Sequence, residues 1–145
     1  MSFKVALYKT PQAKSGRNND LNKEVKAGEP IPLTSNFTIG DALTLSDDGK
    51  YIEVGNDVEV VRVTAQLQFA VNDKRCGVAI RKVTNGEPLM IGCAYGGGTS
   101  YSINCTVLMN VSQGDQIYVA STSDAVINSS IGGGFRSYLL VEKVM

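Results

Sequence analysis

The sequence contains no histidine among its 145 residues. Histidine is the commonest general base, the usual partner of a nucleophilic serine or cysteine, and the commonest ligand of transition metals. The spaced Asp and Asn ligands of a calcium loop are also missing. We therefore expect no catalytic residue, no metal site and no cofactor, and a protein that is not an enzyme.

An excess of positive charge is missing as well. Lysine and arginine together number 14, as do aspartate and glutamate, so the formal net charge is zero. Binding to nucleic acid or to an anionic membrane surface usually depends on a basic excess. No apolar run approaches the roughly 18 residues of a membrane-spanning helix. We expect neither nucleic acid nor a membrane among the partners.

Cysteine is scarce, and the first residues do not read as a signal peptide. Cys76, Cys93 and Cys105 are an odd number, which favours free thiols in a reducing compartment. Cys93 and Cys105 flank a glycine turn, and a disulfide bond between them is the alternative that the sequence leaves open. The first residues alternate between polar and apolar types and lack a continuous apolar stretch. We expect the protein to stay in the compartment where it is made.

Two acidic pairs and two glycine runs are the remaining candidates for sites of chemistry. Asp47 and Asp48 precede a glycine, a common turn sequence, and Asp57 lies near Glu59 at the predicted end of a strand. Both pairs are predicted to be solvated turns, not acid–base catalysts. The runs at residues 96–98 and 132–134 lack the spacing of a phosphate-binding loop and are predicted to be tight turns.

Alternation of apolar and polar residues is the strongest pattern in the chain. From Val61 to Val71 every second residue is apolar, which predicts a strand with one buried face. Similar segments recur at residues 76–80, 89–95, 101–111, 117–119 and 135–144. Asn85-Gly86 and Gly114-Asp115 are predicted turns between them. Turn signals about 8–12 residues apart are typical of a β-sandwich or barrel, so the pattern predicts an all-β domain.

The first 40 residues differ from the rest. Residues 3–8 alternate as a short strand would, residues 10–29 are polar, and residues 31–39 resume a short apolar pattern interrupted by proline. The sequence therefore predicts an N-terminal arm with an edge strand at 1–40, followed by a β-sandwich domain at 41–145.

Three segments resemble the globular head of the C1q and tumour-necrosis-factor superfamily. They are residues 78–89 with the Asn85-Gly86 turn, residues 105–119 with Gly114-Asp115, and residues 135–141, which carry aromatic and leucine side chains. The resemblance covers somewhat over half of the chain and implies a jelly-roll β-sandwich that forms a homotrimer. Ser137 departs from the pattern, because the family often has glycine there.

The resemblance also implies where an interface lies. In that family, certain strands line the threefold axis of the trimer or the core beneath it. The matching strands of this chain carry four aromatic residues, which are the candidate trimer interface: Phe69, Tyr118, Phe135 and Tyr138. Tyr95 and Tyr101 flank the glycine turn at 96–98 and are candidates for a surface contact with a sugar or a protein, with ordinary packing as the alternative.

Short jelly-roll chains of this kind are similar to the trimeric knobs, head fibres and decoration proteins of tailed bacteriophages and prophages. This likeness implies a non-enzymatic structural protein of the virion, made in the cytoplasm of the host bacterium. Its partners would be copies of itself and other virion proteins such as the major capsid protein. The alternative is a trimeric receptor-binding tip of a tail or fibre that recognises a saccharide on the host surface.

Overall fold

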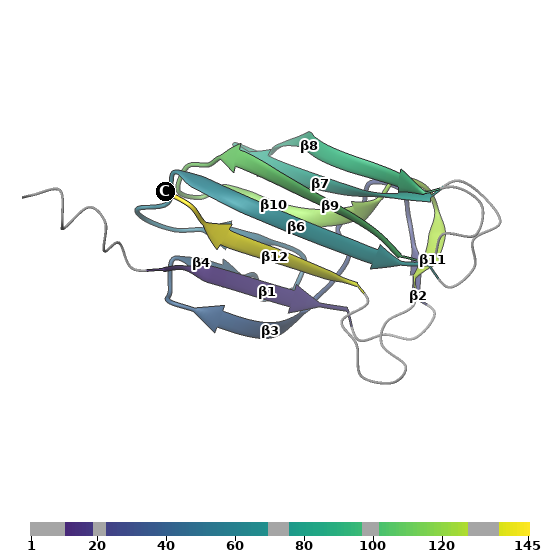
Figure 1. Ribbon diagram of the computed structural model, residues 1–145, viewed down its shortest axis with the longest axis horizontal. Coiled ribbons are helices and arrows are strands. Elements are labelled where there is room, and N and C mark those ends of the chain that lie inside the picture. The colour runs from purple at the N-terminus through teal and green to yellow at the C-terminus, as the bar shows by residue number, and fades with distance from the viewer. Residues whose placement is uncertain (1–10, 19–22, 70–75, 97–101, 128–136) are drawn as a thin grey trace, which may run out of the picture.

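The structure is a computed structural model that describes residues 11–18, 23–69, 76–96, 102–127 and 137–145. Within these ranges the chain forms twelve strands and no helix (Figure 1). The strands are β1 (Ala13–Arg17), β2 (Lys23–Val25), β3 (Thr34–Ile39), β4 (Leu43–Leu45), β5 (Ile52–Val54), β6 (Val60–Gln68), β7 (Cys76–Thr84), β8 (Glu87–Gly96), β9 (Ser102–Asn110), β10 (Gln116–Ser121), β11 (Ala125–Ile127) and β12 (Tyr138–Lys143).

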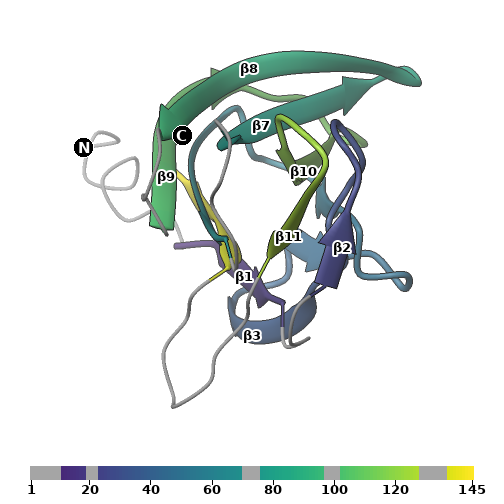
Figure 2. The same ribbon diagram turned by 90° about the vertical axis from the view of Figure 1, so that its right-hand side faces the viewer.

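Ten of these strands form two antiparallel sheets. The first sheet has the order β3-β1-β12-β6-β9 and the second has the order β4-β5-β10-β7-β8, while β2 and β11 pair separately. Figure 2 shows from one end how the two sheets enclose the core. Neighbouring strands such as β1 and β12 come from opposite ends of the chain, an arrangement typical of jelly rolls and unlike a simple meander.

The core follows from the two-residue period of the strands. On β6 the odd-numbered side chains of residues 61–69 are fully buried, and Arg62 on the other side is exposed. This confirms the strand that alternation predicted. The second sheet buries a matching set: Ile52, Val78, Ile80, Ile117 and Val119. Burial of one such side chain contributes about 1.5–3 kcal/mol, so the packing of the two layers is the main source of stability.

The predicted Asn85-Gly86 turn joins β7 to β8. Both residues have positive φ angles, 52° for Asn85 and 80° for Gly86, and Thr84 pairs with Glu87 across the turn. Two consecutive residues in this conformation define a type I′ turn, which matches the twist of the flanking strands. The sequence prediction of a hairpin at this position is confirmed.

The Gly114-Asp115 turn is held by the buried carboxylate of Asp115. This carboxylate accepts hydrogen bonds from the Ser112 amide at 2.9 Å and the Thr84 hydroxyl at 3.0 Å, and the Lys82 amine lies 3.9 Å away. Gly114 supplies a φ of 92°, which residues with a Cβ rarely adopt. The pair of residues therefore fixes the β9–β10 connection to β7 in the second sheet.

Ser137 has a structural role that glycine could not fill. Its hydroxyl is fully buried and accepts a hydrogen bond from the Gln68 amide at 3.0 Å, at the end of β6. Its backbone carbonyl accepts a second bond from the Asn18 amide at 3.0 Å. The departure from the family pattern thus adds a bond that joins the start of β12 to β6.

The predicted N-terminal arm requires correction. Strand β1 lies inside the first sheet, between β3 and β12, so β1 and β3 belong to the sandwich and not to an arm at 1–40. Alternation did not reveal β1 because its sequence, Ala-Lys-Ser-Gly-Arg, has no alternating apolar residues. Lys14 is nevertheless buried, and its amine donates hydrogen bonds to the hydroxyls of Ser35 and Thr38. The predicted strand at residues 3–8 lies outside the described residues.

Candidate interaction surfaces

Two of the predicted interface residues lie inside a single copy of the chain. Phe69 is fully buried in the core, where it pairs with Ile127, and Tyr118 is almost fully buried. The Tyr118 ring packs edge-on against Tyr51 with 5.6 Å between ring centroids, and its hydroxyl donates to the Gly28 carbonyl at 3.5 Å. The resemblance left open whether Phe69 and Tyr118 line the interface or the core beneath it, and the structure buries both within a single copy of the chain.

The other predicted residues lie on two different surfaces or outside the described ranges. Tyr138 is half-buried on the outer side of the first sheet, opposite Arg17 and Gln66 on the flanking strands. Tyr95 lies on β8 with 51% of its surface exposed. Phe135 and Tyr101 fall outside the described residues. The structure therefore does not bring the described candidates together at one site.

The outer side of the first sheet is a broad surface that we call the open face. Side chains on each strand that alternate with the buried ones point to this side, and the strand registers align them in rows across the sheet. The open face comprises Ile39 and Phe37 of β3, Ala13, Ser15 and Arg17 of β1, Glu142, Leu140 and Tyr138 of β12, Arg62, Thr64 and Gln66 of β6, and Leu108, Thr106 and Asn104 of β9.

Large apolar side chains lie exposed at both margins of the open face. Phe37 and Ile39 project from β3 at one edge, and Leu108 projects from β9 at the other with 65% of its surface exposed. Among the described residues of this face, only Arg17, Arg62 and Glu142 carry charge. Exposed apolar groups grouped on one surface of a globular protein commonly mark an interaction site. The open face therefore has the composition of a docking surface.

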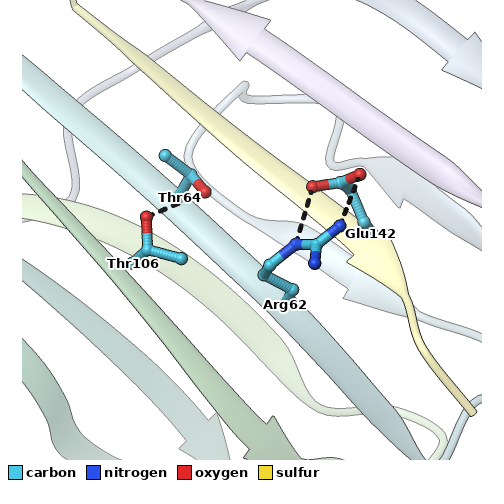
Figure 3. Close-up of polar contacts among 4 residues, drawn as sticks. All are labelled: Arg62, Thr64, Thr106 and Glu142. Carbon is cyan, nitrogen blue, oxygen red and sulfur yellow. Dashed lines mark hydrogen bonds and ion pairs between the residues drawn. The ribbon is translucent and has the colours of Figure 1, made fainter.

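A polar pair of contacts occupies the middle of the open face (Figure 3). The Arg62 guanidinium on β6 donates from Nε to Oε1 of Glu142 at 3.2 Å and from Nη2 to Oε2 at 3.3 Å. The hydrogen bond to the Glu142 carboxylate raises the pKa of Arg62. Beside them the hydroxyls of Thr64 and Thr106 share a hydrogen bond of 3.2 Å. The two charges thus neutralise each other within one copy.

Three exposed apolar side chains lie along the edge strand of the second sheet. Leu89, Met90 and Tyr95 are exposed along β8, and we call these three residues the β8 edge. Strand β8 also packs beside β9, where the two sheets meet. Gly92 permits this approach, because a Cβ added there would lie 2.4 Å from Cγ1 of Val107. Because Leu89 and Met90 are consecutive, their side chains point to opposite sides of β8, and the β8 edge is not one continuous apolar surface.

Sequence reasoning missed most of these surface residues. Leu108 is the clearest case: it interrupts the predicted strand at 101–111 as an apolar residue at a position whose neighbours in the same phase are polar. Leu140 has the same character, because it follows the buried Leu139 and points to the opposite side. An apolar residue at a position where the strand otherwise has polar residues is the signal that would have identified these exposed apolar side chains from the sequence.

The cysteines are all unpaired. Cys76 is buried, Cys93 is exposed and Cys105 is partly buried. Burial, followed by the nearby Cys93, raises the pKa of the Cys105 thiol. A raised pKa disfavours the thiolate, which is the nucleophilic form. Cys105 is therefore unsuited to nucleophilic chemistry at neutral pH.

Asp47, Asp48 and Asp57 lie in turns. The Asp48 carboxylate accepts hydrogen bonds from the Ser46 hydroxyl at 2.7 Å and the Lys50 amide at 3.1 Å, and the pKa of Asp48 is lowered, chiefly by the bond from Ser46. A general acid at neutral pH needs the opposite shift. Asp57 has a φ of 63° and lines an open cavity of about 740 Å³ together with Asp41 and Glu59. In the described ranges no three Asp, Glu or Cys side chains are placed to hold a metal ion.

The described part of the chain contains no helix with the length and apolar character needed to cross a membrane.

Comparisons with known proteins identify the fold. Neither a family model nor a curated protein matches the sequence. Among solved structures, murine APRIL at pH 5.0 aligns with a TM-score of 0.75 and 15% identity over 92% of this chain and 99% of that chain. Eiger TNF from S. frugiperda aligns with a TM-score of 0.78 and 13% identity over 94% of each chain. At such identities the likeness concerns the fold, and it confirms the sequence prediction: the chain is an all-β jelly-roll sandwich of the C1q/TNF type.

Proposed function

We propose that this chain is a non-enzymatic structural protein of a tailed-bacteriophage virion, a homotrimer of the capsid-decoration or head-fibre type. Its partners are copies of itself and other virion proteins such as the major capsid protein. The observation that carries self-assembly is the exposure of large apolar side chains, Phe37, Ile39 and Leu108, on the open face of one small chain.

The copies are proposed to form a ring. A ring forms when the open face of one copy packs against a different surface of the next, which is a heterologous contact. Such contacts close into a ring when the rotation between copies allows it. The C1q/TNF-type fold supports closure at three copies. Burial of Phe37, Ile39 and Leu108 would supply much of the association free energy.

The properties of the candidate catalytic side chains favour a structural role over an enzymatic one. The chain has no histidine, Asp48 has a lowered pKa and Cys105 a raised one. The virion assignment rests on the likeness of short jelly-roll chains to phage decoration proteins and head fibres. It places the protein on the particle surface after synthesis in the host cytoplasm.

The virion role is tested on particles. We expect particles assembled without this protein to lose density on the capsid surface in electron micrographs and to rupture more readily on heating, and we expect both properties to return when the purified protein is added. Particles with unchanged outline and unchanged thermal stability, or particles that do not take up the added protein, would refute the proposal.

The second candidate function is a trimeric receptor-binding tip that recognises a host-surface saccharide. Exposed Tyr95 favours it, because a tyrosine ring offers a flat apolar face and a polar tip for stacking on a sugar. On an array of bacterial surface glycans, this candidate predicts binding to a defined saccharide that Tyr95→Ala abolishes and Tyr95→Phe largely keeps. A decoration protein is expected to bind none of them.

A further inference from the structure

Arg81 is a described arginine without a partner in the chain. It follows the fully buried Ile80 on β7, so its side chain points away from the core, to the outer side of the second sheet. No hydrogen bond or ion pair joins Arg81 to another described residue, and its Nε atom is buried. The other described arginines, Arg17 and Arg62, each have an interaction partner. Arg81 is thus a partly buried charge whose counter-charge is not supplied by the described part of the chain.

The side chains around Arg81 on the outer side of the second sheet carry no charge to pair with it. Its cross-strand partners are Tyr118 on β10 and Met90 on β8. The rows of partners on either side also contain no Asp, Glu, Lys or Arg, and they consist of Gln116, Val83, Pro88, Ala120, Ala79 and Cys93. The sheet therefore isolates one positive charge among uncharged neighbours.

Gly28 lies beside the end of the Arg81 side chain and offers it no counter-charge. A Cβ at position 28 would be 3.4 Å from Nη1 and 3.6 Å from Nη2 of Arg81. Glycine has no side chain to pair with the guanidinium, and the φ of 78° at this position disfavours other residues. The next residue, Glu29, lines a cavity with Lys26 and Lys50. The segment that approaches the guanidinium thus leaves it unpaired.

A guanidinium in this setting is suited to bind an oxyanion. It remains protonated in proteins, and its burial without a hydrogen-bond partner costs free energy. An unsatisfied buried donor in a folded protein therefore calls for an explanation, such as a bound ion. The planar fork of N–H donors matches two oxygens of a carboxylate or a phosphate. Because Nε is buried, Nη1 and Nη2 are the donors available to such a group.

We propose that Arg81 is an oxyanion-binding site on the outer side of the second sheet, which takes a phosphate or carboxylate group through Nη1 and Nη2. The exposed Met90 beside it is an apolar flank of the site. This inference goes beyond the proposed function and does not depend on self-assembly, because the open face belongs to the other sheet.

The test follows the Nε–Hε resonance of Arg81 in heteronuclear NMR spectra of the isotope-labelled protein. Inorganic phosphate is the first probe, glucuronate is the carboxylate probe, and glucose is the uncharged control, with the ionic strength held constant by sodium chloride. We expect at least one oxyanion to shift the Arg81 resonance to saturation, because the guanidinium is free to bind it. Glucose should leave the resonance unchanged. A response to phosphate alone identifies a phosphate group as the ligand, and a response to glucuronate alone identifies a carboxylate.

Matched variants separate binding at Arg81 from a general effect of ions. The oxyanion should raise the melting temperature of the unchanged protein, because it binds the folded state, and should not raise that of Arg81→Gln. Without an oxyanion, Arg81→Gln should melt no lower than the unchanged protein, because an unpaired charge has been removed. Arg62→Gln is the control. The Arg62 guanidinium is already bonded to Glu142, so its loss should leave the response to the oxyanion intact.

Two results would overturn the inference. One is an Arg81 resonance that neither phosphate nor glucuronate shifts. The other is a rise in melting temperature that persists in Arg81→Gln. Should Arg81→Gln fail to fold, Arg81→Lys replaces it: this variant keeps the charge but lacks the planar fork, and the response to the oxyanion should weaken. An unweakened response in Arg81→Lys would also contradict the assignment.

Discussion

The outer sides of the two sheets differ in what covers them. On the second sheet the outward side chains Ala79, Ala120 and Tyr118 are buried, and residues near Gly28 contribute to the cover: the Gly28 amide bonds to the Ser121 carbonyl, and its carbonyl accepts the Tyr118 hydroxyl. On the first sheet Ala13 and Ser15 are buried on the outer side, but Phe37, Ile39 and Leu108 at the margins are exposed. The chain thus covers the middle of the second sheet by itself, whereas under the proposed self-assembly a second copy covers the exposed margins of the first.

This difference separates stability from assembly. A substitution on the covered side of the second sheet should weaken the fold of a single copy. A substitution on the open face should weaken association and leave that fold intact. The four predictions that follow use this distinction, in order of decreasing effect.

The largest effect is expected for Ala120→Glu. Ala120 is fully buried on the outer side of the second sheet, so the new carboxylate would have neither room nor a partner. Urea denaturation should show a loss of about 3 kcal/mol or more in the free energy of unfolding. Thr64→Glu, on the open face, is the control and should change this value by less than about 0.5 kcal/mol. Equal losses in the two variants would remove the distinction between the sheets.

Asp115→Ala should follow. The buried carboxylate holds the β9–β10 turn through the Ser112 amide and the Thr84 hydroxyl, and its loss leaves these donors without an acceptor. We expect a loss of about 2 kcal/mol in the free energy of unfolding. Assembly of the protein that remains folded should not change, because the turn does not belong to the open face. A variant of unaltered thermal stability would contradict the role given to the turn.

Leu108→Asp should weaken association and leave the stability of the fold nearly unchanged, which is the reverse of the effect expected for Asp115→Ala. Because Leu108 is 65% exposed, its replacement is expected to shift the unfolding free energy of a single dissociated copy by less than about 0.5 kcal/mol. The dissociation constant of the assembly should rise about 30-fold or more, since a charge would be placed within an apolar contact. Thr44→Asp, at an exposed position of β4, is the matched control. Association that tolerates Asp at position 108 would exclude the open face as the interface.

The smallest effect concerns acid. The pKa of Asp48 is lowered from its ordinary value in the folded protein, chiefly by the hydrogen bond from Ser46. A depressed folded pKa means that the contribution of this carboxylate to stability is present above the unfolded pKa and is lost as pH falls through the folded pKa. Asp48→Asn should therefore melt slightly below the unchanged protein at pH 6, with the difference vanishing in strong acid. Asp47→Asn is the control, and a difference independent of pH would oppose this account.

The sequence revealed the parts of the fold that repeat with period two or depend on turn chemistry. The buried phase of β6, the Asn85-Gly86 hairpin and the jelly-roll class are all confirmed. These features are local, because a strand with one buried side and a turn with two positive φ angles each leave their own pattern in a few residues.

The missed features depend on contacts between distant segments. Strand β1 carries a lysine on its buried side, and only the hydroxyls of Ser35 and Thr38 on β3 make that burial tolerable. The family resemblance made Tyr118 a candidate for the interface or the core beneath it, and residues far earlier in the chain, near Gly28, contribute to its burial. The open face went unnoticed because its apolar residues are spread over four strands and meet only in the folded sheet.

The central claim is that a second copy of the chain covers the open face of the first sheet. Sedimentation equilibrium of the unchanged protein beside Leu108→Asp tests it most directly. The account predicts three times the 15.5 kDa chain mass for the unchanged protein and a shift towards the mass of one chain for the variant. A single-chain mass for the unchanged protein at every concentration, or a trimer that Leu108→Asp leaves intact, would contradict it.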